Sequence, residues 1–338
     1  MLYSKYEVDM KKRKLKLKKQ AYFILAIPVI IIVIVLLGIN YYNDYKYKQT
    51  NEYKLIEHGY TMDDTKYLLE HLNDDKINNI LSRDKDDNII ALLKEKYFLW
   101  KNLDKYLEYY KKNSDKSLKD IISIINVHSN NKWYQVKYET DISKNELMLV
   151  NKFYELNKDY SPDNLENISL KYSYGNYGDN KLISYAYDEF INMHADALEK
   201  GYYLIVNSSY RDYQDQDEIY SYRKKTQGER KADETAARPG HSEHQTGLVV
   251  DITSKGAPID VDFSESDDYK WLQNNAYKYG FIQRYPKGKT YITGYEPESW
   301  HYRYVGKDVA KIIHDEDITF DEYYAYYIIG EQEEIELN

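Results

Sequence analysis

The sequence predicts an α+β domain that is preceded by one transmembrane helix and a mostly helical spacer. Three observations support this fold class. A basic segment and a long apolar stretch open the chain, polar residues with helical apolar spacing follow, and strand-like and helical patterns alternate after position 146. The predicted segments are a basic cytoplasmic tail (1–20), a transmembrane anchor (21–39), a helical spacer or small domain (40–145), the α+β domain (146–330) and an acidic tail (331–338).

Residues 21–39 form the predicted membrane anchor, because they are continuously apolar and long enough to cross a hydrocarbon core. Tyr41 and Tyr42 follow at the expected membrane interface, and basic residues cluster between positions 11 and 19. By the positive-inside rule, the sequence predicts a single-pass protein of the cell membrane with a cytoplasmic N-terminus and an extracellular main domain. A cleaved signal peptide is the alternative, but no A-x-A site follows the long apolar run.

The segment 40–145 has helical periodicity and many polar residues. Two interpretations remain open for it: a spacer that holds the following domain away from the membrane, or a small helical domain that packs on it. The formal net charge of −9 argues against nucleic acid as the main partner. The chain contains no cysteine, so disulfides and cysteine-ligated zinc sites are excluded.

The stretch from Arg238 to Asp251 reads RPGHSEHQTGLVVD and predicts a turn followed by a short strand. Alternation along the strand places Asp251 on the opposite face from the core candidates Leu248 and Val250. His244, in the preceding turn, can reach the same point in space as Asp251. Histidine and aspartate together suit a borderline divalent cation, and zinc is the first candidate.

A second stretch, EPESWHYRYVG, adds His301 to this group. Two histidines and one aspartate give three protein ligands for one zinc ion per chain and leave a fourth tetrahedral position for water, as catalytic zinc sites do. A nearby carboxylate can take a proton from that water, and Glu298 is the candidate, with Glu296 as its rival. Strict strand alternation would point Glu298 and His301 to opposite faces, so a local turn must bring them together.

These motifs resemble those of VanY-type D-alanyl-D-alanine carboxypeptidases, which are zinc peptidases of the peptidoglycan stem peptide. SEHQTGLVVD is similar to their S-x-H-x-x-G-x-A-x-D signature, ESWHYRYVG to their E-x-W-H-x-R motif, and SSYRDYQDQ at 208–216 to their S-x-Y-R-S-Y-x-x-Q segment. The resemblance covers roughly residues 147–306. It departs from the family pattern at Val249 and Asp212, where alanine and serine are usual.

The resemblance implies the mixed sheet-and-helix fold of zinc DD-peptidases, which is hedgehog-like, and a peptidoglycan stem peptide as substrate. It implies that Glu298 moves protons and that Arg211 holds the oxyanion that forms at the attacked carbonyl. It further implies that four residues contact the substrate: Ser242, Gln216, Tyr285 and Trp300.

The expected reaction is the removal of a terminal D-Ala from the stem peptide. Two alternatives remain open. The same site could serve an L,D-carboxypeptidase or a peptidoglycan endopeptidase. A zinc-bearing but inactive wall-binding module is the alternative of another class, and the presence of Glu298 and Arg211 argues against it, because a pure binder needs neither residue.

Overall fold

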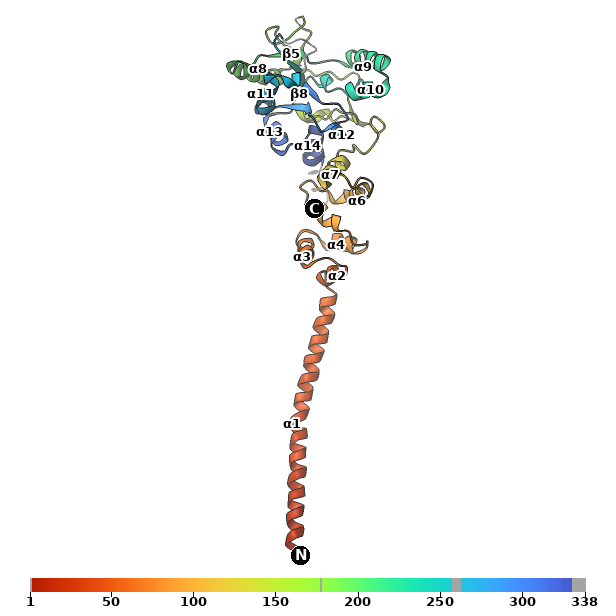
Figure 1. The fold of residues 1–338 in the computed structure, drawn as a ribbon, viewed down its shortest axis with the longest axis vertical. Coiled ribbons are helices and arrows are strands. Elements are labelled where there is room, and N and C mark those ends of the chain that lie inside the picture. The colour runs from red at the N-terminus through yellow and green to blue at the C-terminus, as the bar shows by residue number, and fades with distance from the viewer. Residues whose placement is uncertain (1, 177, 257–262, 330–338) are drawn as a thin grey trace. The chain divides into compact units, whose positions relative to one another are not determined.

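The computed structural model describes residues 2–176, 178–256 and 263–329 (Figure 1). The predicted acidic tail, 331–338, lies outside the described residues. The chain divides into two compact units, the first ending at Leu93 and the second beginning at Lys94. The segment 40–145 therefore contributes to both units.

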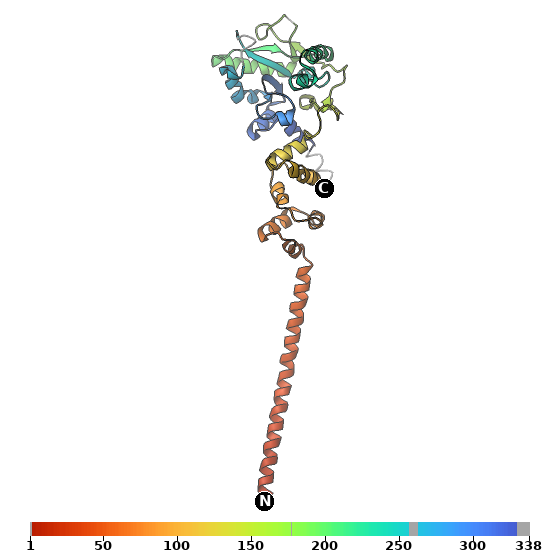
Figure 2. The same cartoon turned by 45° about the vertical axis from the view of Figure 1, so that its right-hand side comes forward.

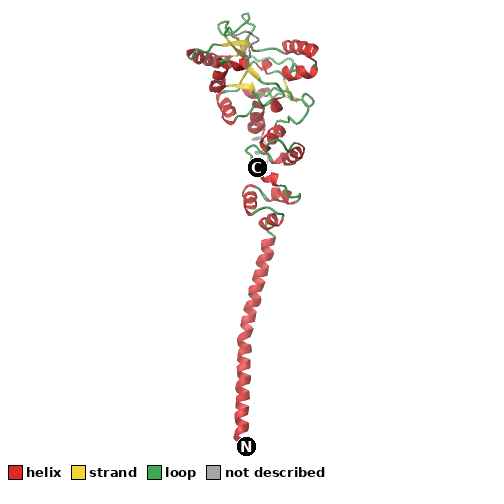
Figure 3. Cartoon of the chain, viewed as in Figure 1, coloured by secondary structure: helices red, strands yellow, loops and turns green. Residues whose placement is uncertain are grey.

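The first unit is helical throughout its regular structure (Figure 3). Its helices are α1 (Leu2–Lys48), α2 (Asn51–Glu57), α3 (Met62–His71), α4 (Asp74–Leu81) and α5 (Asp87–Leu93). Thr50, Thr61 and Asn73 are the N-caps of α2, α3 and α4. Their side-chain oxygens accept hydrogen bonds from backbone N–H groups in the first turn of each helix. The buried apolar residues of the short helices include Leu55, Leu68, Ile77, Ile80, Ile89 and Leu92.

The predicted anchor falls within α1. In the described part of the chain, Tyr22–Lys48 is the one helical stretch that is long and apolar enough to cross a membrane, and none of its apolar window is buried by protein. Pro28 lies inside the helix, where a membrane-spanning segment tolerates it.

A four-stranded antiparallel sheet forms the centre of the second unit (Figures 2 and 3). The strands are β5 (Leu204–Ser208), β6 (Val249–Ser254), β8 (Glu298–Tyr304) and β7 (Phe281–Tyr285), in that spatial order. Helices α8 (Ser184–Glu199) and α11 (Asp267–Asn275) pack on one face, where Phe190 and Leu272 meet Val250 in the main core. This arrangement confirms the predicted α+β class.

The remaining elements surround this sheet. The helices are α6 (Leu103–Lys112), α7 (Leu118–Asn126), α9 (Tyr213–Gln227), α10 (Glu229–Thr235), α12 (Thr290–Thr293), α13 (Lys307–Glu316) and α14 (Phe320–Tyr323), which continues as a π-helix over Tyr324–Ile329. Short 3₁₀ turns cover Trp100–Asn102, Ile142–Leu147, Glu243–Thr246, Phe263–Glu265 and Ala276–Tyr279. Two small ribbons pair β1 (Tyr138–Glu139) with β2 (Tyr154–Glu155), and β3 (Leu165–Asn167) with β4 (Lys181–Ile183).

The part of the predicted spacer that follows Lys94 packs on the α+β domain. The Tyr97 ring stacks on the Tyr326 ring at a centroid distance of 3.8 Å. Ser123, on α7, donates a hydrogen bond to Glu322 of α14 (Oγ–Oε1 2.7 Å). Because these groups lie at a buried interface, residues 94–145 belong to the same folding unit as the α+β domain.

Candidate active site

Strand pairing brings two of the predicted metal ligands together. Asp251 of β6 lies directly opposite His301 of β8 in the antiparallel register, so the two side chains lie on the same face of the sheet. His244 comes from the 3₁₀ turn that precedes β6. That turn ends at Gly247, whose φ is +68° and whose position leaves no room for a Cβ, which would lie 2.8 Å from Leu165.

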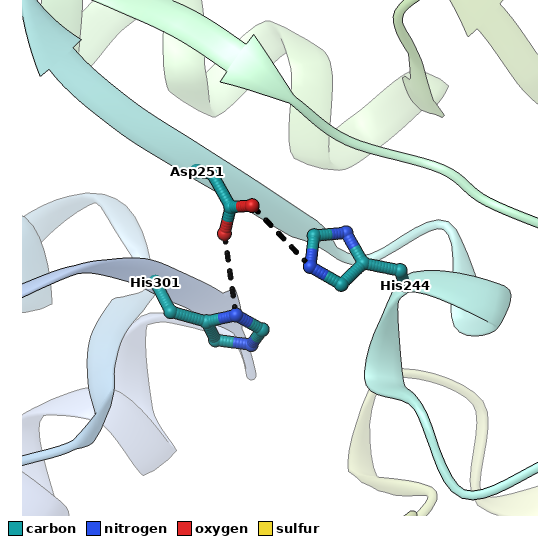
Figure 4. Close-up of side chains that lie close together, drawn as sticks. All are labelled: His244, Asp251 and His301. Atoms are coloured by element: carbon teal, nitrogen blue, oxygen red, sulfur yellow. Dashed lines mark ion pairs between the residues drawn. The ribbon is translucent and has the colours of Figure 1, made fainter. Parts of the chain in front are cut away.

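The three side chains converge on one point, with Asp251 between the two histidines (Figure 4). His244 Nε2 lies 3.5 Å from Asp251 Oδ2, and His301 Nδ1 lies 3.2 Å from Asp251 Oδ1. One donor atom from each residue falls within 4.8 Å of the others, which is the spacing of a metal-binding group. The structure thus brings together the three ligands that the sequence predicts.

The other ring nitrogen of each histidine faces an acceptor. His244 Nδ1 lies 2.5 Å from the carbonyl oxygen of Ser209, so its N–H donates there and Nε2 is left for the metal. His301 Nε2 lies 3.6 Å from Glu243 Oε2, which leaves Nδ1 facing Asp251. Such outer acceptors fix the tautomer and orientation of zinc-ligating imidazoles, and the donor set therefore fits zinc.

The electrostatics of the group also fit a bound dication. Burial lowers the pKa of His244 to about 3, so this imidazole is neutral, as a metal ligand must be. Burial opposes protonation of His301 as well, but hydrogen bonds to Asp251 and Glu243 raise the pKa of this imidazole to about 9. The acidic groups around His301 therefore favour positive charge at this position, which a bound metal ion would supply.

Glu298 lies beside the predicted ligands, although strict strand alternation would place it on the opposite face of the sheet from His301. Its Oε2 is 3.5 Å from His301 Nδ1. The β7–β8 pairing is irregular here: Gln283 pairs with Tyr302 and Tyr285 with Glu298, so β8 contains extra residues between these pairs. A bulge of this kind re-aims side chains next to active sites. Burial raises the pKa of Glu298 to about 7, so this carboxyl group can exchange a proton near neutral pH.

The rival carboxylate, Glu296, faces a different partner. Its Oε1 lies 2.6 Å from Lys231 Nζ in a half-exposed ion pair, although the residue also borders the cavity. This geometry favours Glu298 as the group that acts beside the metal.

All nine predicted site residues line one cavity of about 250 Å³. Gln216, Ser242 and Tyr285 are buried in its wall, whereas Trp300 is 42% exposed at its edge and is thus not a core residue. The Arg211 guanidinium is held by Ser208 (Nη1–Oγ 3.4 Å) and interacts electrostatically with Asp251 and Glu298. The remaining members of the predicted set are His244, Asp251, Glu298 and His301.

Sequence reasoning missed Glu243. This fully buried carboxylate accepts hydrogen bonds from Arg284 (Nε–Oε1 2.9 Å) and Arg303 (Nη1–Oε1 3.0 Å), while its other oxygen faces His301. The two arginines hold the pKa of Glu243 well below its usual range, against the effect of burial. Its position next to His244 and the presence of Arg303 two residues after His301 were the available signals.

Comparison with known proteins places the chain among carboxypeptidases. The family described as VanY, D-alanyl-D-alanine carboxypeptidase, matches residues 179–307. The putative carboxypeptidase YodJ of Bacillus subtilis is 46% identical over 184 residues, which is 54% of this chain and 67% of YodJ. The bifunctional D-Ala-D-Ala dipeptidase and carboxypeptidase VanXYC of Enterococcus gallinarum is 31% identical over 186 residues, or 54% of this chain and 95% of VanXYC.

Two solved structures are also similar. The LD-carboxypeptidase LdcB is 42% identical with a TM-score of 0.54, and the alignment covers 58% of this chain and 94% of LdcB. A mutant of the vancomycin resistance D,D-pentapeptidase VanY in complex with Zn(II) is 35% identical with a TM-score of 0.45, covering 53% of this chain and 98% of that one. The present chain belongs to the VanY family of D-alanyl-D-alanine carboxypeptidases, and its His244, Asp251 and His301 provide the ligand set of a zinc metallopeptidase.

Proposed function

We propose that this protein is a membrane-anchored carboxypeptidase that removes the terminal D-Ala from peptidoglycan stem peptides. The observation that carries the proposal is the group of His244, Asp251 and His301, with Glu298 and Arg211 in the same cavity. A pure wall-binding module would need neither an acid–base carboxylate nor a guanidinium beside the metal ligands.

Each residue of the cavity has a role that follows from its position. His244, Asp251 and His301 would hold zinc, which when bound supplies a Lewis acid and a water molecule of lowered pKa. Glu298 accepts a proton from the attacking water and passes it to the leaving amine. Arg211 donates hydrogen bonds to the scissile carbonyl oxygen as negative charge develops there. Gln216, Ser242, Tyr285 and Trp300 orient the peptide from the cavity wall.

A second candidate reaction uses the same groups on a different bond. LdcB, with which this chain shares 42% identity and its fold, is an LD-carboxypeptidase. Removal of D-Ala from a tetrapeptide, where the preceding residue has the L configuration, is therefore the alternative to removal from a pentapeptide.

Defined stem peptides separate these reactions. We expect the purified full-length protein, in detergent, to release alanine from a pentapeptide, with the products identified by mass spectrometry. Release from the tetrapeptide but not from the pentapeptide would establish the L,D reaction in its place. Cleavage inside the peptide would indicate an endopeptidase, and the absence of any cleavage by the zinc-loaded protein would contradict a catalytic role.

We further propose that α1 anchors the protein with its N-terminus in the cytoplasm. The basic residues between positions 11 and 19 support this orientation. Protease added to intact protoplasts is then expected to digest the part of the chain that follows Tyr42. Digestion in lysed cells alone would show that the orientation is reversed.

A further inference from the structure

Arg223 is a second guanidinium in the substrate cavity, and the resemblance to the family gives it no role. It extends from α9 and is half-buried, with one hydrogen bond to the carbonyl oxygen of Thr235 (Nη1–O 3.2 Å). Arg211 and Arg223 are the two arginines among the described residues that line the cavity of the metal ligands.

The guanidinium of Arg223 has no carboxylate within ion-pair distance among the described residues. Three other arginines of the same unit differ in this respect: Arg238 pairs with Asp233 (2.9 Å), and Arg284 and Arg303 share the buried Glu243. A guanidinium that faces a cavity without a carboxylate is available to bind one bidentately.

Arg223 also marks a junction between two hollows. It lines the 250 Å³ cavity of the metal ligands and a neighbouring groove of about 970 Å³, which continues to Phe263, Tyr269 and Lys287. Arg211, Asp251, Pro297 and Trp300 line both hollows too, so Arg223 is part of the boundary that a peptide crosses between the groove and the metal ligands. The charge of Arg223 also interacts with Glu298 and Arg211, so it acts on the region where the reaction takes place.

From this position we propose that Arg223 binds a carboxylate of the substrate, and that this contact sets which carboxylate the enzyme requires as a free acid. The inference rests on the proposed carboxypeptidase function. Arg211 is committed to the scissile carbonyl, and a peptide carboxylate that enters a partly enclosed cavity needs a cation of its own. The source of the carboxylate is either the C-terminus of the leaving residue or an internal carboxylate of the stem peptide.

Binding of matched peptides to the full-length, zinc-loaded protein in detergent tests the proposal. The KM and kcat values of stem pentapeptides with free or amidated C-termini, and with free or amidated internal carboxylates, are measured from release of the last residue. Arg223→Gln is expected to weaken binding of the all-acid peptide by about 10- to 100-fold, the usual effect of losing a charged hydrogen bond. Arg223→Lys is expected to recover part of the loss, because it restores the charge without the fork.

The amidated peptides identify the partner. If the effect of Arg223→Gln disappears with the C-terminal amide, Arg223 binds the free end, and if it disappears with the internal amide, Arg223 binds the internal carboxylate. An equal loss with every peptide would overturn the proposal. Lys287→Gln is the matched control, because it removes a positive charge from the groove but not from the metal cavity.

Lys287→Gln is expected to leave the preference for the free acid unchanged. If it changes this preference as much as Arg223→Gln does, the net charge of the groove sets the preference, and not Arg223. Zinc content and melting temperature show that the variants are folded. If the wild-type protein hydrolyses none of the peptides, the proposed function itself is refuted. If the variants are active but do not discriminate between acid and amide peptides, only the role of Arg223 is refuted.

Discussion

Replacement of Glu298 by glutamine is expected to lower stem-peptide hydrolysis at least about a hundredfold while zinc binding stays normal. Glutamine keeps the size and the hydrogen-bonding capacity of the side chain but cannot accept the proton of the attacking water. His244, Asp251 and His301 provide three ligands without Glu298, so the loss of this carboxylate should remove no ligand. Steady-state kinetics and elemental analysis of the same preparation give the two quantities.

Glu296→Gln provides the matched control. Glu296 lies two residues away in the chain and is engaged with Lys231 on the surface side of the cavity. It is expected to change turnover little. Loss of zinc in Glu298→Gln would mean that this residue is a ligand, and an active Glu298→Gln beside an inactive Glu296→Gln would reverse the assignment of the base.

Replacement of His244 by alanine is expected to remove most of the zinc and, with it, the activity. The wild-type protein should contain about one zinc ion per chain, as a site with three converging ligands predicts. Alanine removes one of the three donors and leaves Asp251 without the imidazole that lies 3.5 Å away. Elemental analysis of the purified full-length protein measures the loss directly.

His241→Ala separates this effect from general damage. His241 is also buried and lies three residues earlier, but its ring contacts the Asn151 carbonyl oxygen (2.8 Å) and the Glu155 carboxylate (3.2 Å), and it is not part of the converging group. This variant should keep its zinc. An unchanged zinc content in His244→Ala would show that the ligand assignment is incorrect.

The sequence was sufficient to predict that His244, Asp251 and His301 converge, because the spacing within each motif reflects its local geometry. His244 sits in a turn, Asp251 follows on the strand that the turn begins, and His301 lies on a strand that pairs with it. The spacing of residues within a motif predicts local arrangements of this kind well. The position of Glu298 relative to His301 depends instead on the bulge against β7, and a pairing irregularity leaves no signature in the residues of one strand.

Glu243 shows the same limit more clearly. In the motif it is a charged residue between two polar neighbours, where an exposed side chain would be the ordinary expectation. Its burial is compensated by Arg284 and Arg303, which are distant in sequence and which the fold brings to one oxygen. A charge network of this kind is a property of the tertiary structure, so the closeness of Glu243 to His244 and of Arg303 to His301 in the sequence could suggest a role but not the ion pairs.

The contacts of Asp321 determine which residues a transferable form of this catalytic domain must include. Asp321 lies on α14, beyond the 179–307 family match, and it binds both Arg284 inside the match (2.6 Å) and Asn151 before it (2.7 Å). Breaking one such buried ion pair costs about 3–5 kcal/mol, against a total stability of roughly 5–15 kcal/mol for a typical domain. Residues 179–307 are thus not a transferable cassette, and gene fusion or domain exchange must carry the chain from Lys94 through α14.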